Sequence, residues 1–171
     1  MTLLFMDGFN HYDTNYLTKK GWTNPVGTAI IDPTGGEKGN GCVELNYLEE
    51  LRYSIGNISG KRFTCGFATY LVNMPNSSMR EFFHARNDTG GSYVTGFMGS
   101  DGHVEIWNNG VPGQIYDSGV GFITTGKWYY VEFQIEFLNN SNGFVGMQWD
   151  GVTKLAQTAD NVWTGSSNYN Y

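Results

Sequence analysis

Charged residues are scarce in this chain of 171 residues, and they make up only 15% of it. The usual share in globular proteins is about a quarter. Lys and Arg together number 10 against 16 Asp and Glu, which gives a formal net charge of −6. Proteins that bind nucleic acids normally need a basic face, so this acidic balance argues against a nucleic-acid partner.

Cysteine and long hydrophobic runs are also lacking. Cys42 and Cys65 are too few for a disulfide framework, and we expect them to be buried thiols. No apolar run approaches the roughly 18–20 residues that a membrane helix needs, so no membrane insertion is predicted. The apolar start, 1–6, lacks the basic region and the cleavage site of a secretory signal. We therefore expect synthesis in the cytoplasm and no secretion through an N-terminal signal.

Glycine and aromatic residues are abundant instead. The chain has 24 Gly, and aromatic residues make up 16% of it. Gly favours turns, whereas aromatic residues favour strands. A helical bundle would need more Ala, Leu, Glu and Lys. The composition therefore predicts an all-β protein with many turns.

Alternation of polar and apolar residues with period two is the dominant pattern. Asp150-Gly151 predicts a two-residue hairpin turn, and 46–54 has the apolar spacing of one or two helical turns. Short strands at regular spacing predict an antiparallel β-sandwich of the concanavalin A-like jelly-roll type over 1–160, followed by a tail, 161–171. Strands are expected over 2–6, 28–31, 42–45, 62–72, 79–86, 92–98, 103–107, 114–116, 128–138, 144–149 and 152–157.

The inward faces of the longest strands predict the core. Alternation along 128–138 assigns one side of that strand to the core and the other side to solvent. The same argument applies to 62–72 and 144–149. The predicted core residues are Phe63, Cys65, Phe67, Val131, Phe133, Ile135, Val145 and Met147.

The opening residues 3–12 (LLFMDGFNHY), followed by Trp22, resemble the start of a group of phage virion proteins. These proteins carry a concanavalin A-like, laminin-G-type jelly-roll domain. Four later segments fit the same pattern: 39–42, 63–70, 128–133 and the hairpin at 150–152. The resemblance implies a structural part of the virion, such as a capsid decoration, tail or baseplate protein. It would be located in the virion, attach to other virion proteins and form a homo-oligomer.

Signals for catalysis are weak in this sequence. His11, His84 and His103 are the only histidines, and no Gly-X-Ser-X-Gly motif is present. Jelly-roll glucanases carry Glu-X-Asp-X-Glu on one strand, but Glu132 and Glu136 flank Gln134, which cannot carry the middle charge. The pattern therefore indicates an amphipathic strand. We predict that the chain has no catalytic residues and is not an enzyme.

A carbohydrate-binding surface is the alternative to a purely structural role. Trp128, Tyr130, Glu132 and Gln134 share one strand face, and Trp107 shares a face with His103 and Glu105 on the preceding strand. If the two strands are neighbours, these side chains form a shallow platform for a host-surface glycan, as in a lectin. The competing interpretation is that both Trp side chains pack under loops at the rim of the core.

Metal and cofactor motifs give no positive signal, since zinc and EF-hand patterns are absent. No cofactor is predicted. A structural calcium ion stays open because hard oxygen ligands are common in the loops, although no ligand set can be named. The loop carboxylates in question are Asp7, Asp13, Asp101, Asp117 and Asp150.

The tail has features that suit strand addition to a sheet edge. It carries large side chains and has no Pro or charge after Asp160. We expect Trp163, Tyr169 and Tyr171 to contact another virion chain during assembly.

Overall fold

The computed structural model describes two compact units. One consists of Met1–Ile55 with Asn170–Tyr171, and the other of Gly56–Tyr169. The described residues are 17–26, 30–32, 34–36, 41–45, 50–56, 62–76, 79–87, 92–108, 113–138, 143–158 and 169–170. The predicted border at residue 160 stays a prediction, because it falls outside these ranges.

The first unit contains a short 3-10 helix and two antiparallel strand pairs. The helix, η2, covers Thr18–Lys20, and Gly21 ends it with a φ of 89°. A small core forms where Leu17 and Ile31 are buried against Trp22, Val43 and Leu51. The strands of this unit are β1 (Trp22–Val26), which pairs with β4 (Glu50–Gly56), and β2 (Ile30–Asp32), which pairs with β3 (Cys42–Glu44).

The helical interpretation of 46–54 is wrong for residues 50–54. These residues belong to β4, and Tyr53 pairs with Trp22 of β1. A partner strand satisfies the backbone groups that the helix would otherwise satisfy internally, so tertiary pairing overrides the weak helical spacing. The strand β1 itself was not predicted, because Pro25 interrupts its pattern.

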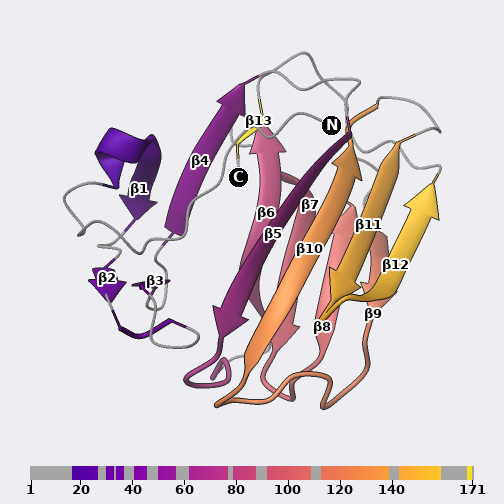
Figure 1. Ribbon diagram of the computed structural model, residues 1–171. Helices are drawn as coiled ribbons and strands as arrows, with labels where there is room; N and C mark the ends of the chain where they lie inside the picture. Colours follow the sequence, from indigo (N-terminus) through magenta and orange to yellow (C-terminus); the bar gives the residue numbers. More distant parts are fainter. Residues whose placement is uncertain are drawn as a thin grey trace. The chain divides into compact units, whose positions relative to one another are not determined.

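The second unit is an antiparallel β-sandwich (Figure 1). Its two sheets have the strand orders β12-β11-β10-β5 and β6-β7-β8-β9. The strands of the first sheet are β5 (Arg62–Tyr70), β10 (Trp128–Glu136), β11 (Phe144–Trp149) and β12 (Val152–Thr158). Those of the second are β6 (Met79–Asn87), β7 (Ser92–Gly99), β8 (Val104–Asn108) and β9 (Gly113–Asp117).

The core lies between these two sheets. Phe133 of β10 is fully buried, and its ring stacks on Phe83 of β6 with centroids 4.1 Å apart. Burial raises the pKa of the Cys65 thiol to about 12, since the charged thiolate is disfavoured away from water. The strand register confirms the predicted inward face for Phe63, Cys65, Phe67, Val131, Phe133, Ile135, Val145 and Met147.

Most of the predicted strands are present in the structure, with ends that differ by a few residues. Asp150 and Gly151 form the predicted hairpin turn, with φ values of 50° and 76°. The predicted strand over 2–6 lies outside the described residues. Of the tail, the structure describes only β13 (Tyr169–Asn170), so the assembly contact stays a prediction for Trp163, Tyr169 and Tyr171.

Candidate functional site

The outer surface of the sheet that contains β10 carries the main candidate site. Side chains along a strand alternate between the two faces of a sheet, and every second residue of β10 is buried. The residues between them point outward with their register neighbours on β5, β11 and β12. We call this surface the β10 face, and its members are Arg62, Thr64, Gly66, Ala68, Tyr70, Trp128, Tyr130, Glu132, Gln134, Glu136, Phe144, Gly146, Gln148, Thr153 and Ala156.

Aromatic rings gather at one end of the β10 face. Trp128 lies opposite Tyr70 in the register, and their ring centroids are 5.3 Å apart. Tyr130 follows on the same strand and is 48% exposed. Its hydroxyl lies against Gly66 of β5, where the Cβ of any other residue would collide with it. Gly66 therefore lets the Tyr130 side chain lie across the neighbouring strand while much of it stays in contact with solvent.

Polar side chains occupy the middle of the β10 face. Glu132 Oε1 accepts a hydrogen bond from Gln134 Nε2 at 3.2 Å. Across the register, Glu132 lies opposite Gln148 of β11, and Gln134 lies opposite Gly146. The surface thus offers a carboxylate and two amides side by side, which can both donate and accept hydrogen bonds.

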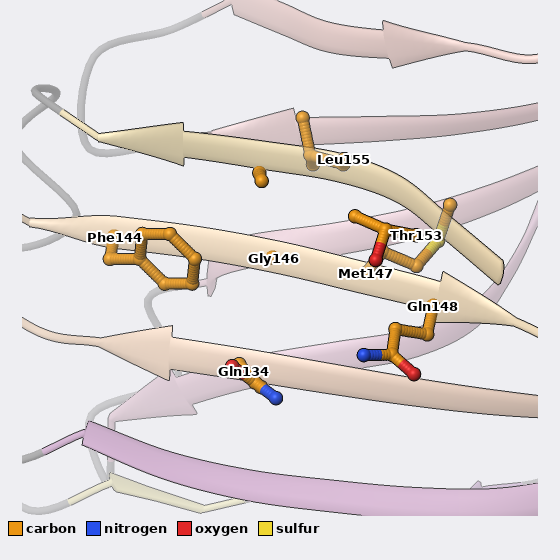
Figure 2. Close-up of a pocket in the computed structure, with 8 residues that line it drawn as sticks. Gln134, Phe144, Gly146, Met147, Gln148, Thr153 and Leu155 are labelled. Atoms are coloured by element: carbon orange, nitrogen blue, oxygen red, sulfur yellow. The ribbon is translucent and has the colours of Figure 1, made fainter. Parts of the chain in front are cut away.

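A shallow depression of about 160 Å³ adjoins these polar groups. Figure 2 shows the Phe144 ring beside Gly146 of the same strand, with Gln134 and Gln148 on the side toward β10. A Cβ at Gly146 would come within 2.8 Å of the Phe144 ring. The hollow therefore exists because Gly146 and Ala156 leave space between larger neighbours. Its lining residues are Gln134, Phe144, Gly146, Met147, Gln148, Thr153, Leu155 and Ala156.

An ion pair lies at the end of the β10 face opposite the aromatic rings. Arg62 Nη2 lies 3.0 Å from Glu136 Oε2, and Arg62 Nε donates to the same oxygen at 3.1 Å. The guanidinium also lies over the Phe144 ring, 4.1 Å from its centroid. Arg62 is therefore neutralised by a carboxylate and held against an aromatic ring.

The structure does not bring Trp107 to the other four predicted binding residues. Trp107 belongs to β8, in the opposite sheet, and alternates there with buried Ile106 and Asn108. Its side chain thus points away from the β10 face, on the other outer surface of the sandwich. The predicted platform required β8 and β10 to be paired neighbours, but they belong to opposite sheets that pack across the core. Trp128, Tyr130, Glu132 and Gln134 do share one surface.

The second outer surface holds a charged network around His103. His103 Nδ1 contacts Asp101 Oδ1, while Nε2 lies 3.4 Å from Glu105 Oε1 and 3.2 Å from Met79 Sδ. The hydrogen bond to Asp101 raises the pKa of His103 and lowers the pKa of Asp101. Glu105 Oε2 also accepts from Trp107 Nε1 at 2.7 Å. Both imidazole nitrogens are thus engaged by side chains of this network.

Sequence reasoning missed several members of the β10 face. Tyr70, Phe144 and Gln148 come from β5 and β11, and only the register places them beside β10. The sequence did indicate that each of them points outward, because each alternates with predicted core residues on its own strand. Which strands pair, however, depends on the fold as a whole.

Neither a metal cluster nor a membrane-spanning helix occurs within the described ranges. There, no group of three or more His, Cys, Asp or Glu side chains is placed to hold a metal ion. Asp7 and Asp13, two of the loop carboxylates considered for calcium, lie outside those ranges. No helix of the described chain has the length and hydropathy to cross a membrane.

Comparison with known proteins gives matches to solved structures. No protein-family model and no curated protein matches the chain. The carbohydrate recognition domain of Emp46p aligns with a TM-score of 0.61 and 11% identity, over 96% of this chain and 84% of that one. An endo-β-1,4-glucuronan lyase from the fungus Trichoderma reesei aligns at 0.53 and 17%, over 94% and 76%. A carbohydrate esterase from the Shiga toxin-encoding bacteriophage phi24B aligns at 0.56 and 13%, over 90% and 82%.

These likenesses identify the architecture. The chain has the concanavalin A-like jelly-roll fold. At identities from 11 to 17% the fold is what the chain and these structures share.

The prediction that the chain is not an enzyme is contradicted by these comparisons. The same fold occurs in a polysaccharide lyase and in a carbohydrate esterase. The prediction rested on a missing glucanase motif, which bears on glycoside hydrolysis alone, and on the absence of Gly-X-Ser-X-Gly and metal motifs. Catalytic groups also converge in space and not in sequence, so missing motifs were weak grounds for excluding activity.

Proposed function

We propose that this protein binds a polysaccharide chain along the β10 face. The observation that carries the proposal is an aromatic group, formed by exposed Tyr70 and Tyr130 with half-buried Trp128. This group lies beside the polar row of Glu132 and Gln134. Aromatic rings bury the apolar faces of sugars, and a few fixed polar groups give orientation. A flat sheet surface with these groups in line suits an extended polymer better than a single sugar.

The comparisons support this proposal at the level of the fold. All three similar structures are named for carbohydrates: one is a recognition domain, one a lyase and one an esterase. Function resides in a site and not in a fold, so the argument for this chain depends on the side chains of the β10 face.

We further propose that the protein acts as part of a phage particle, where the β10 face would serve host-surface recognition. The resemblance of residues 3–12 and Trp22 to phage virion proteins supports this setting. One of the similar structures is also a bacteriophage protein. Attachment to other virion proteins and homo-oligomer formation belong to the same proposal.

Affinity electrophoresis in gels that contain a soluble polysaccharide tests the binding function. The panel comprises neutral glucan, galactomannan and arabinoxylan, together with polyuronates. The test variant is Tyr130→Ala combined with Trp128→Ala, and the matched control is Trp107→Ala on the opposite surface. Melting temperatures verify that each variant is folded.

The wild type should be retarded by at least one polysaccharide. The double variant should bind about tenfold more weakly or worse, since losing aromatic stacking worth about 1.4 kcal/mol corresponds to that factor. The Trp107 control should be retarded like the wild type. Equal retardation of the wild type and the double variant, or no retardation on any gel, would refute the proposal.

A further inference from the structure

We infer that the β10 face selects uncharged polysaccharides over polyuronates. This inference rests on the proposed binding function and adds the class of ligand. It follows from the charges of the described side chains on that surface.

Glu132 places a negative charge in the middle of the β10 face. Its carboxylate accepts a hydrogen bond from the neutral amide of Gln134, at 3.2 Å. The charge on the carboxylate is thus not balanced by a cation there. A ligand carboxylate at this position would meet a like charge, which disfavours binding.

Arg62 is the one cation among the described members of the β10 face, and it is already engaged. Both its Nε and its Nη2 atoms contact Glu136 Oε2, at 3.1 and 3.0 Å. Its guanidinium lies over the Phe144 ring. A uronate that approaches Arg62 would therefore compete with the Glu136 carboxylate, whose negative charge also opposes uronate binding.

Within the described ranges, the two lysines nearest this surface are directed elsewhere. Lys127 Nζ lies 4.7 Å from the ring centroid of Tyr129, which is buried on the inward side of β10. Lys154 Nζ lies 5.4 Å from the ring centroid of Phe122. Phe122 in turn packs on the buried Trp149, on the core side of the sheet.

The remaining polar groups suit sugar hydroxyls. Gln134 and Gln148 offer amides, and Thr153 offers a hydroxyl beside the depression. Each of these groups can both donate and accept a hydrogen bond, as a sugar hydroxyl can. This set differs from the cationic donors that carboxylate recognition favours. The glucuronan lyase of similar fold is named for a polyuronate, so the inference separates this chain from that ligand class.

Paired polymers that differ only in charge provide the test. Each polyuronate (polyglucuronate, polygalacturonate and alginate) is compared with its carboxyl-reduced, neutral counterpart by isothermal titration with the full chain. At least one neutral polymer should bind, and at least tenfold more tightly than its charged parent. Added salt should narrow the difference, because it screens the repulsion.

Glu132→Gln is the decisive variant, with Glu105→Gln on the opposite surface as the matched control. Glu132→Gln should raise the affinity for the charged polymer several-fold, whereas Glu105→Gln should leave it unchanged. Equal or tighter binding of a polyuronate, lost in Tyr130→Ala, would overturn this inference and leave the binding function intact. If no polymer of any pair binds and no polysaccharide retards the protein in the gels, the proposed function fails and this inference fails with it.

Discussion

Phe133 shows how a single residue connects the two sheets of the sandwich. It is fully buried on β10 and stacks on Phe83 of the opposite sheet. We predict that Phe133→Ala lowers the free energy of unfolding by about 3–5 kcal/mol, through lost burial and the cavity left behind. Urea denaturation measures this loss. Val120→Ala, at a residue that is 77% exposed, serves as the control and should stay within about 0.5 kcal/mol of the wild type.

His103 predicts a pH dependence of stability. Its pKa is raised above 6.5 mainly by the hydrogen bond to Asp101, and charges on Asp101, Glu105 and Asp117 add to the effect. A raised pKa in the folded state stabilises the protein fully below pH 6.5, and this contribution is lost as the pH rises through the raised value. The pKa of Asp101 is lowered in the folded state, so this carboxylate stabilises the fold at neutral pH. Its contribution to stability is lost only as the pH falls below 3.8.

The measurement compares melting temperatures of the wild type and His103→Gln at about pH 6 and about pH 9. The wild type should exceed the variant by more at the lower pH. High salt should reduce this difference in part, because Asp101 is exposed to solvent whereas His103 and Glu105 are half-buried. A difference that does not change with pH would show that the charge on His103 contributes nothing to stability.

At the scale of elements, the β11–β12 hairpin depends on its turn. Asp150 and Gly151 both have positive φ, and a Cβ at Gly151 would meet no atom within 4 Å. The cost of Gly151→Ala is therefore backbone strain alone, about 1 kcal/mol. Chemical denaturation should show this loss, whereas Val152→Ala at an exposed strand position should change stability less. An unchanged midpoint in Gly151→Ala would contradict the turn geometry.

Some strands could be predicted from the sequence and others could not. Strands such as β10 are long and alternate regularly, so their position and inward face follow from the pattern alone. β1 and β4 were missed because Pro25 and the spacing of Leu48 and Leu51 obscure them. Those strands are fixed by pairing with each other, which a local pattern does not contain.

The candidate site was also predicted only in part, for the residues that lie on a single strand. Trp128, Tyr130, Glu132 and Gln134 lie on one strand, so alternation alone places them together. Trp107 was joined to them on the assumption that its strand lies beside 128–138, but β8 and β10 belong to different sheets. The contributions of β5 and β11 became apparent only with the register.

At the scale of the whole molecule, the C-terminal tail tests the proposed role in the particle. Deleting residues 161–171 should leave the melting temperature and polysaccharide binding unchanged but prevent incorporation into the virion or oligomer. In the described part of the segment, the two-residue strand β13 pairs within a sheet of this chain. Such a short pairing adds little stability, and the segment is otherwise too polar to offset its own ordering entropy without a partner. A much lower melting temperature with normal assembly would instead place the tail in the core of the protein itself.

Binding of a glycan on the β10 face would change the surroundings of Trp128, so the indole N–H signals of the five Trp residues report on it. The ¹⁵N-labelled protein would be titrated with cellohexaose, mannohexaose and xylohexaose. We predict a saturable shift of the Trp128 signal with at least one of them, while the Trp107 signal stays in place. A shift of Trp107 without Trp128, or no shift with any of the three, would contradict the claim.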